Sequence, residues 1–168
     1  ARRDIRSVLV ICPKPLIVEG KWRRELKRFG EDFEELDGSA LRQCMKELFL
    51  DGVWPEKKAK CIIPYSLFTE ELLYGEDSDK KKGRKRQWKG LLKTNSLNFD
   101  LVIVDEAHHV RHPDTYAAQA VKFFCDQAEA VVFLTATPIQ TKNEDLFELL
   151  NLLRPDLVID QASFQQMT

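Results

Sequence analysis

The chain has 168 residues, of which 43% are apolar and 32% are charged, and its formal net charge is −1. This composition is typical of one soluble globular domain and excludes the disordered and membrane classes. No apolar run approaches the roughly 18 residues that a membrane-spanning helix needs, and the charged residues 1–7 do not resemble a secretion signal. We therefore expect a cytoplasmic protein without a membrane partner, in a bacterial cytosol or nucleoid, or in the nucleus of a eukaryote.

The four cysteines are widely separated and show no CxxC spacing: Cys12, Cys44, Cys61 and Cys125. No histidine stands at the distance from them that a zinc site requires. We expect all four to be reduced, buried thiols.

The first half of the chain alternates between short apolar runs and amphipathic segments. Residues 7–12 form a continuous apolar run that Pro13 stops, which is typical of a strand buried on both faces of a parallel sheet. Residues 16–29, with Trp22 as an expected packing residue, have apolar side chains near helical spacing and predict a helix. The next predicted elements are a strand at 33–36, a helix at 39–50, a strand at 60–64 and a helix at 65–74.

A polar, charged segment at 75–90 interrupts this alternation, and we expect it to be a mobile insertion. Its later part favours a basic helix at 84–93. Seven of the ten residues 80–89 are Lys or Arg, so the run could add salt-dependent affinity for nucleic acid. A solvated surface would have the same composition, and both interpretations stay open.

The second half contains the strongest strands, at 99–104 and 130–134, and helices at 115–125 and 144–153. Strands that alternate with helices predict an α/β fold with a doubly wound, mainly parallel sheet flanked by helices. Ligands bind such sheets outside the carboxyl ends of the strands. A Rossmann-type dinucleotide enzyme shares this alternation but requires a GxGxxG turn, which the sequence lacks.

An acidic turn follows the strand at 99–104 and consists of Asp105, Glu106, Ala107 and His108. Adjacent residues that leave a strand point in different directions, so Asp105 could hold the shell of a magnesium ion while Glu106 addresses an attacking water. The small Ala107 leaves room for close approach. Alternatively, the two carboxylates only cap the following segment and the histidine is a loop residue.

A hydroxyl-rich turn follows the strand at 130–134 and consists of Thr135, Ala136 and Thr137 before a proline. It should lie at the same edge of the sheet, where Thr135 and Thr137 could reach His108 and relay a change at the acidic turn. A simple Thr-Pro strand exit is the alternative.

Four blocks of the sequence together resemble Swi/Snf-type DEAH ATPases of helicase superfamily two, which couple ATP hydrolysis to translocation on duplex DNA. VIVDEAHHVRHP (102–113) and FLTATPIQTKNEDLFELLNLLRP (133–155) resemble motifs II and III of that family. VLVICPKPLIVEGKWRREL (8–26) is similar to motif Ia, and CIIPYSLF (61–68) to a later block around a tyrosine. The resemblance implies a RecA-like first lobe.

The resemblance also implies roles for the matching residues. Asp105 would hold Mg²⁺ through water, Glu106 would orient and deprotonate the water that attacks ATP, and His108 would link this site to Thr135 and Thr137. Such a pair of carboxylates suits phosphoryl transfer, which needs mainly positioning and charge neutralisation. The phosphate contacts to double-stranded DNA would come from the motif Ia and tyrosine blocks, at Pro13, Lys14, Tyr65 and Ser66.

One motif of the family is missing, because no GxxxxGK[ST] phosphate loop occurs in the sequence. We therefore expect residues 1–168 to be a partial N-terminal ATP-binding lobe of a helicase or translocase. Alone it should bind ATP poorly, because the phosphate loop is missing, and it should be inactive, because the second RecA-like lobe is missing too. A non-catalytic nucleic-acid-binding or scaffold domain with the same fold is the alternative.

Overall fold

The structure is built on a parallel β-sheet, as the alternation of strands and helices predicted. The computed structural model describes residues 4–75, 90–93, 97–136 and 143–153. The sheet that they form has the order β2-β3-β1-β4-β5, and every neighbouring pair is parallel. Its strands are β1 (Val8–Cys12), β2 (Glu34–Glu35), β3 (Lys60–Pro64), β4 (Leu101–Asp105) and β5 (Ala130–Leu134).

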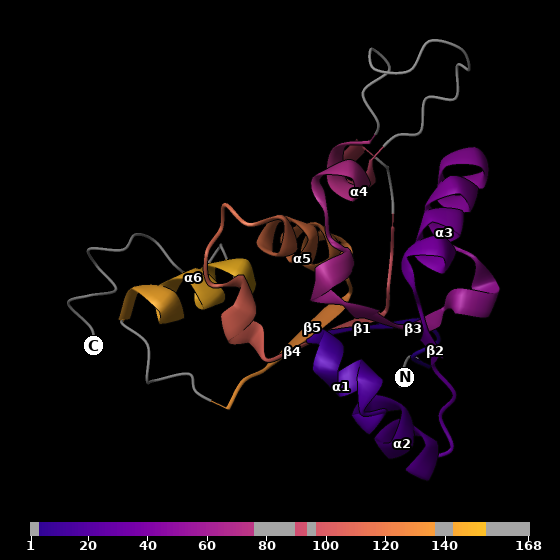
Figure 1. Cartoon of the computed structure of the whole chain (residues 1–168), viewed down its shortest axis with the longest axis horizontal. Coiled ribbons are helices and arrows are strands. Elements are labelled where there is room, and N and C mark those ends of the chain that lie inside the picture. The colour runs from indigo at the N-terminus through magenta and orange to yellow at the C-terminus, as the bar shows by residue number, and fades with distance from the viewer. Residues whose placement is uncertain (1–3, 76–89, 94–96, 137–142, 154–168) are drawn as a thin grey trace.

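Helices cover both faces of this sheet. Figure 1 shows α1 and α2 on one side, and α3, α4 and α5 on the other. The α-helices are α1 (Lys14–Val18), α2 (Lys21–Arg28), α3 (Gly38–Asp51), α4 (Glu70–Tyr74), α5 (Tyr116–Gln127) and α6 (Asn143–Leu153). Single 3-10 turns are η1 (Glu56–Lys58), η2 (Tyr65–Leu67), η3 (Leu91–Lys93) and η4 (Ala107–Val110).

The central strand β1 separates two hydrophobic clusters. Leu9 and Ile11 belong to the larger cluster, beneath α3, α4 and α5. Val8, Val10 and Cys12 belong to the smaller cluster, against which side chains of α1 and α2 pack. All five residues of β1 are buried, which explains why its sequence is apolar throughout instead of alternating.

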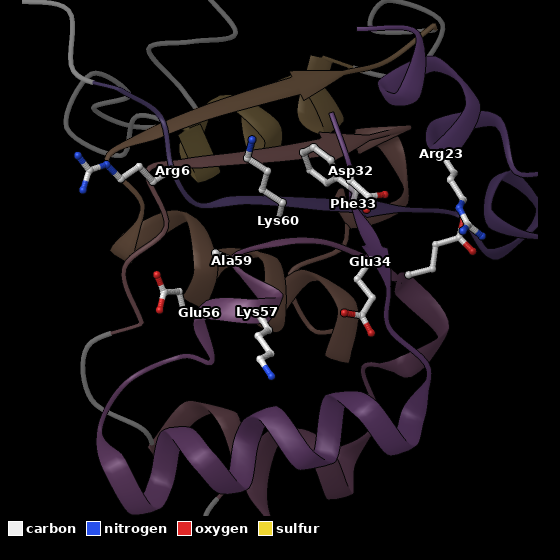
Figure 2. A pocket seen from close by; sticks show the side chains of 10 residues that line it. Arg6, Arg23, Asp32, Phe33, Glu34, Glu56, Lys57, Ala59 and Lys60 are labelled. Carbon is white, nitrogen blue, oxygen red and sulfur yellow. The ribbon is translucent and has the colours of Figure 1, made fainter. Parts of the chain in front are cut away.

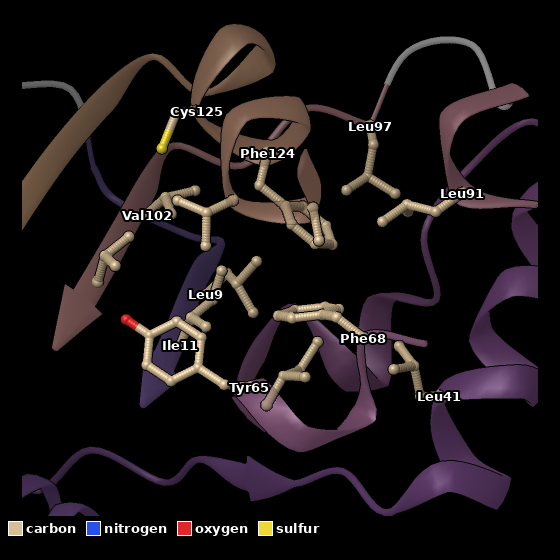
Figure 3. Packing of buried hydrophobic residues seen from close by; sticks show 14 of the residues in the cluster. Leu9, Ile11, Leu41, Tyr65, Phe68, Leu91, Leu97, Val102, Phe124 and Cys125 are labelled. Atoms are coloured by element: carbon tan, nitrogen blue, oxygen red, sulfur yellow. The ribbon is translucent and has the colours of Figure 1, made fainter. Parts of the chain in front are cut away.

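Aromatic rings fill the centre of the larger cluster. Phe124 of α5 lies with its ring centroid 6.0 Å from that of Phe68 and 6.3 Å from that of Phe99. Figure 3 shows Phe68 and Phe124 facing one another close to Leu9 of β1. This packing joins α5 to the segment that follows β3 and to the central strand.

The apolar strand β5 is less buried than its sequence suggests. It pairs only with β4 among the described strands, and Val132 and Leu134 are 41% and 39% exposed. A continuous apolar run therefore identified this strand correctly, but not its place at an edge of the described sheet.

Two helices that the sequence predicted as continuous are each interrupted. The helix expected at 16–29 divides at Gly20, whose φ of 62° places it in the left-handed region that glycine adopts readily. The helix expected at 65–74 divides into η2 and α4, because Thr69 is extended and its hydroxyl accepts a hydrogen bond from the amide of Leu72. A helix N-cap thus lies inside an apparently periodic segment.

Part of the chain analysed by sequence lies outside the described residues. This applies to most of the predicted insertion at 75–90 and to most of the basic helix at 84–93, of which the described end is the 3-10 turn η3.

None of the helices in the described ranges combines the length and the apolarity that crossing a bilayer demands.

All four cysteines are unbridged and buried, which confirms the prediction of reduced, buried thiols. Burial raises the pKa of Cys44 to about 11 and the pKa values of Cys12 and Cys125 to about 12. Burial also raises the pKa of Cys61. Because the thiolate is the reactive form, these side chains are chemically inert in the folded chain.

We predict that Phe124→Ala lowers the free energy of unfolding by about 3–5 kcal/mol, because it removes a ring that is 1% exposed and leaves a cavity among aromatic neighbours. Phe29→Ala is the matched control, since Phe29 is 81% exposed, and it should change stability by less than about 0.5 kcal/mol. Urea-induced unfolding of both variants measures the difference, and equal losses would contradict the packing described for α5.

Candidate active site

Segments from distant parts of the sequence meet at the carboxyl ends of the parallel strands. Cys12 at the end of β1 is in register with Pro64 at the end of β3, and Asp105 at the end of β4 with Leu134 at the end of β5. The residues that follow these four strands therefore leave the sheet at one edge. Together with Asp105, the last residue of β4, they include all the site residues that the sequence predicted, except that Thr137 lies outside the described residues.

Three hydrogen bonds hold Asp105 in place. The indole N–H of Trp22 donates to Oδ2 at 2.7 Å, and the amide of Glu106 donates to Oδ1 at 2.8 Å. The hydroxyl of Tyr65 donates to the main-chain carbonyl oxygen of Asp105 at 2.8 Å. Both carboxylate oxygens and the backbone of Asp105 are thus fixed by separate donors, two of which come from other elements of the fold.

Glu106 has an unusual backbone conformation. Its φ and ψ are both 51°, and it is the one non-glycine residue in the described ranges with a positive φ. A left-handed conformation costs a residue with a β-carbon about 1–2 kcal/mol. The turn bends the chain sharply after β4, so that η4 begins at once and the amide of His109 donates to the carbonyl of Glu106 at 2.9 Å. The carboxylate of Asp105 therefore lies next to Trp22, whereas the adjacent carboxylate of Glu106 lies next to His108.

Histidine side chains lie next to the Glu106 carboxylate. Nδ1 of His108 is 3.3 Å from Oε2 of Glu106, but this buried nitrogen has no hydrogen bond of acceptable geometry. The ring of His108 stacks on that of His109 with centroids 4.6 Å apart, and His109 lies 5.5 Å from the ring of Tyr65. Burial, followed by the neighbouring His108, lowers the pKa of His109, which favours its neutral form.

Asp105 fits a magnesium ion that is held through water. Mg²⁺ commonly keeps several waters and is bound by one or two carboxylates together with substrate phosphates. A carboxylate has about four lone-pair positions, so the two donors on Asp105 leave room to accept hydrogen bonds from metal-bound water. No group of three or more His, Cys, Asp or Glu side chains in the described part of the chain is arranged to hold a metal by itself.

The predicted DNA-contacting residues differ in exposure. Lys14 and Ser66 are exposed and Pro13 is partly exposed, whereas Tyr65 is only 9% exposed and its hydroxyl is bonded to Asp105. Burial raises the pKa of Tyr65 far above its usual value, so this hydroxyl stays protonated and keeps donating. Tyr65 therefore contacts the acidic turn from a buried position, while its chain neighbour Ser66 is exposed.

Sequence reasoning missed the contact of Trp22 with Asp105. Trp22 was interpreted as a packing residue, and its ring does pack against the smaller cluster, but its indole nitrogen reaches the acidic turn. No local pattern could reveal this contact between residues 83 positions apart. The link from His108 to Thr135 and Thr137 stays a prediction.

An open cavity of about 710 Å³ lies at the other end of the sheet. Figure 2 shows residues that begin or precede β1, β2 and β3 around it, including Arg6, Glu34 and Lys60. Its charges are mixed, and Lys60 pairs with Glu31 while Lys58 pairs with Glu34. Because ligands of such sheets bind at the carboxyl ends of the strands, we do not assign the chemistry to this cavity.

Comparison with known families agrees with the motifs in the sequence. The model of the SNF2-related domain family matches residues 2–168. The chain belongs to this family. This membership confirms the resemblance to Swi/Snf-type proteins of helicase superfamily two that the motifs indicated.

Similar proteins match this chain over a small part of their own length. The ISWI chromatin-remodeling complex ATPase ISW1 of Saccharomyces cerevisiae is 26% identical over 156 residues, which cover 93% of this chain and 12% of that protein. The RNA polymerase-associated protein RapA of Pasteurella multocida is 44% identical over 71 residues, or 40% of this chain and 7% of that protein. The Sulfolobus solfataricus SWI2/SNF2 ATPase core in complex with dsDNA has the same fold, with a TM-score of 0.62 and 20% identity over 96% of this chain and 28% of that chain.

We predict that Glu106→Gly is more stable than Glu106→Gln by about 0.5–1 kcal/mol in the free energy of unfolding. Both variants lose the carboxylate, but only glycine relieves the left-handed strain, and its greater freedom in the unfolded chain offsets part of that gain. Denaturant unfolding of the two variants side by side measures this difference. A less stable glycine variant would show that the turn carries no strain.

Proposed function

We propose that this chain is the part of an ATP-dependent DNA translocase or helicase that carries the hydrolysis motif. The observation that carries the proposal is the pair of adjacent carboxylates at the sheet edge, with Asp105 fixed by three hydrogen bonds and Glu106 turned away from it by its backbone. Two carboxylates with different surroundings can take the two roles that hydrolysis of ATP requires.

The role of Asp105 is to hold the magnesium shell. Its carboxylate is oriented by two neutral donors and has lone pairs left to accept hydrogen bonds from metal-bound water. When bound with ATP, Mg²⁺ neutralises charge that develops on the phosphates.

The role of Glu106 is to orient the attacking water and to accept its proton. As the water oxygen bonds to the γ-phosphorus, the bond to the leaving ADP breaks and the water proton passes to Oε1 or Oε2 of Glu106. His108, whose Nδ1 is 3.3 Å from Oε2, is the proposed link from this carboxylate onward. A link from His108 to Thr135, Ala136 and Thr137 would couple ATP hydrolysis to movement of the protein along DNA.

Binding of ATP needs groups that these residues lack. The sequence has no GxxxxGK[ST] motif to surround the phosphates, so we propose that the chain alone binds ATP weakly and does not turn it over. The phosphate loop and a second RecA-like lobe would be supplied from outside these residues.

We predict that Glu106→Gln reduces DNA-stimulated ATP turnover of the whole protein by about 10²–10⁴-fold, because the amide cannot accept the proton from water. Glu25→Gln, at an exposed position of α2, is the matched control and should leave turnover unchanged. The measurement is phosphate release with and without duplex DNA.

The same experiment separates the enzyme from its alternative. The missing phosphate loop is the observation that favours a non-catalytic nucleic-acid-binding or scaffold domain. If the unsubstituted whole protein releases no phosphate when ATP, Mg²⁺ and duplex DNA are all present, the scaffold function replaces the enzymatic one. Equal turnover in Glu106→Gln and the unsubstituted protein would also remove Glu106 from the mechanism.

Double-stranded DNA is the proposed partner at the segments after β1 and β3. Lys14 and Ser66 are exposed at the same edge because their strands are neighbours and parallel, and Pro13 shapes the first of these turns. Contacts of this kind hold phosphates and carry no base specificity. The solved Sulfolobus solfataricus core in complex with dsDNA, which has the same fold, supports duplex DNA as the partner.

We predict that Lys14→Ala weakens binding of duplex DNA to a similar extent for every sequence and lowers the slope of log affinity against log salt by about one phosphate contact. Lys27→Ala removes another exposed lysine, at the end of α2, and serves as the control. Fluorescence anisotropy with two unrelated duplexes over a range of salt concentrations gives both quantities. Identical salt slopes for the two variants would exclude Lys14 as a phosphate contact.

A further inference from the structure

The hydrogen bond between Trp22 and Asp105 joins α2 to the acidic turn. The residues are 83 positions apart, and the 2.7 Å between Nε1 and Oδ2 is a short separation for such a bond. The ring of Trp22 is held against the smaller cluster, next to β1. The donor is therefore supplied by the packed core and not by the turn itself.

The two donors on the Asp105 carboxylate differ in origin. The amide of Glu106 is the next group along the chain and is present in any turn of this shape. Trp22 is the donor that fixes Oδ2, and so it determines how the plane of the carboxylate is rotated about its bond to the β-carbon. The hydroxyl of Tyr65 fixes the main-chain carbonyl group of Asp105.

We propose that Trp22 is a positioning residue that orients the Asp105 carboxylate for the magnesium shell. This role rests on the proposed function, since it matters only if Asp105 holds the ion. Groups that hydrogen-bond to metal-holding carboxylates keep them in one orientation, and their removal typically weakens metal binding or activity by about 10–100-fold.

Trp54 provides a matched comparison within the same chain. Its ring is also partly buried, and its indole N–H also makes one hydrogen bond, to the carbonyl oxygen of Lys58 at 2.9 Å. That bond lies within one short turn before β3, at the opposite end of the strands from Asp105. Replacing either tryptophan by phenylalanine removes one indole donor and keeps an aromatic ring, because the indole can donate but not accept.

The experiment compares Trp22→Phe with Trp54→Phe in the whole protein. Electron paramagnetic resonance measures binding of Mn²⁺, as a probe for Mg²⁺, in the presence of a non-hydrolysable ATP analogue. A second titration measures binding of the same analogue in EDTA, and turnover is recorded against Mg²⁺ concentration. Replacement of Trp22 by benzothienylalanine keeps the shape of the ring without the N–H and serves if the phenylalanine variant folds poorly.

We expect Trp22→Phe to weaken Mn²⁺ binding about 10-fold, and to raise the Mg²⁺ concentration for half-maximal turnover by a similar factor. Affinity for the analogue in EDTA should be unchanged, and Trp54→Phe should alter neither quantity. In the Asp105→Asn background, Trp22→Phe should add no further loss, because it acts through that carboxylate.

Three results would overturn the role of Trp22. Equal Mn²⁺ binding by the two phenylalanine variants would reduce Trp22 to a packing residue, while turnover by the unsubstituted protein would leave the proposed function intact. Weaker binding of the analogue in EDTA by Trp22→Phe would indicate general damage to the nucleotide site. Absence of both metal binding and turnover in the unsubstituted protein would remove the proposed function, and this inference with it.

Discussion

The parallel pairing of β1 with β3 and β4 is the constraint on which the rest of the structure depends. Because all three strands run in one direction, the segments that follow them leave the sheet at a single edge. An exposed lysine, a buried tyrosine and an acidic turn thereby become neighbours although long stretches of chain separate them. The buried, continuously apolar β1 secures this arrangement, since it contributes side chains to the core on both of its faces.

Much of the fold could be predicted because most of its strands are continuous apolar runs. Continuous apolar runs marked β1, β3, β4 and β5, and the parallel arrangement followed from their alternation with helices. The breaks in the two helical segments were missed because the apolar spacing continues across them, although Gly20 and Thr69 are residue types that favour a left-handed turn and a helix N-cap. The edge position of β5 was hidden for a similar reason, since an apolar run does not report which neighbours a strand has.

The candidate site was predictable in its residues but not in its connections. Asp105 and Glu106 follow the strongest strand of the chain, so sequence alone located them at the sheet edge. Glutamate has no local preference for the left-handed region, and the bond from Trp22 depends on where α2 packs, so neither feature has a sequence signal. Both features set the orientation of a carboxylate, and a difference in orientation is what lets two adjacent carboxylates take different roles.

The inert cysteines have a practical consequence for observing this molecule. Because the four native thiols are buried and burial raises their pKa values, thiol-directed dyes and spin labels should bypass them in the folded chain. A single cysteine introduced at exposed Ser66 would then carry a label at one known position, without the removal of any native residue. Because packing buries the native cysteines in the core, a cysteine introduced at the surface can be labelled and observed selectively.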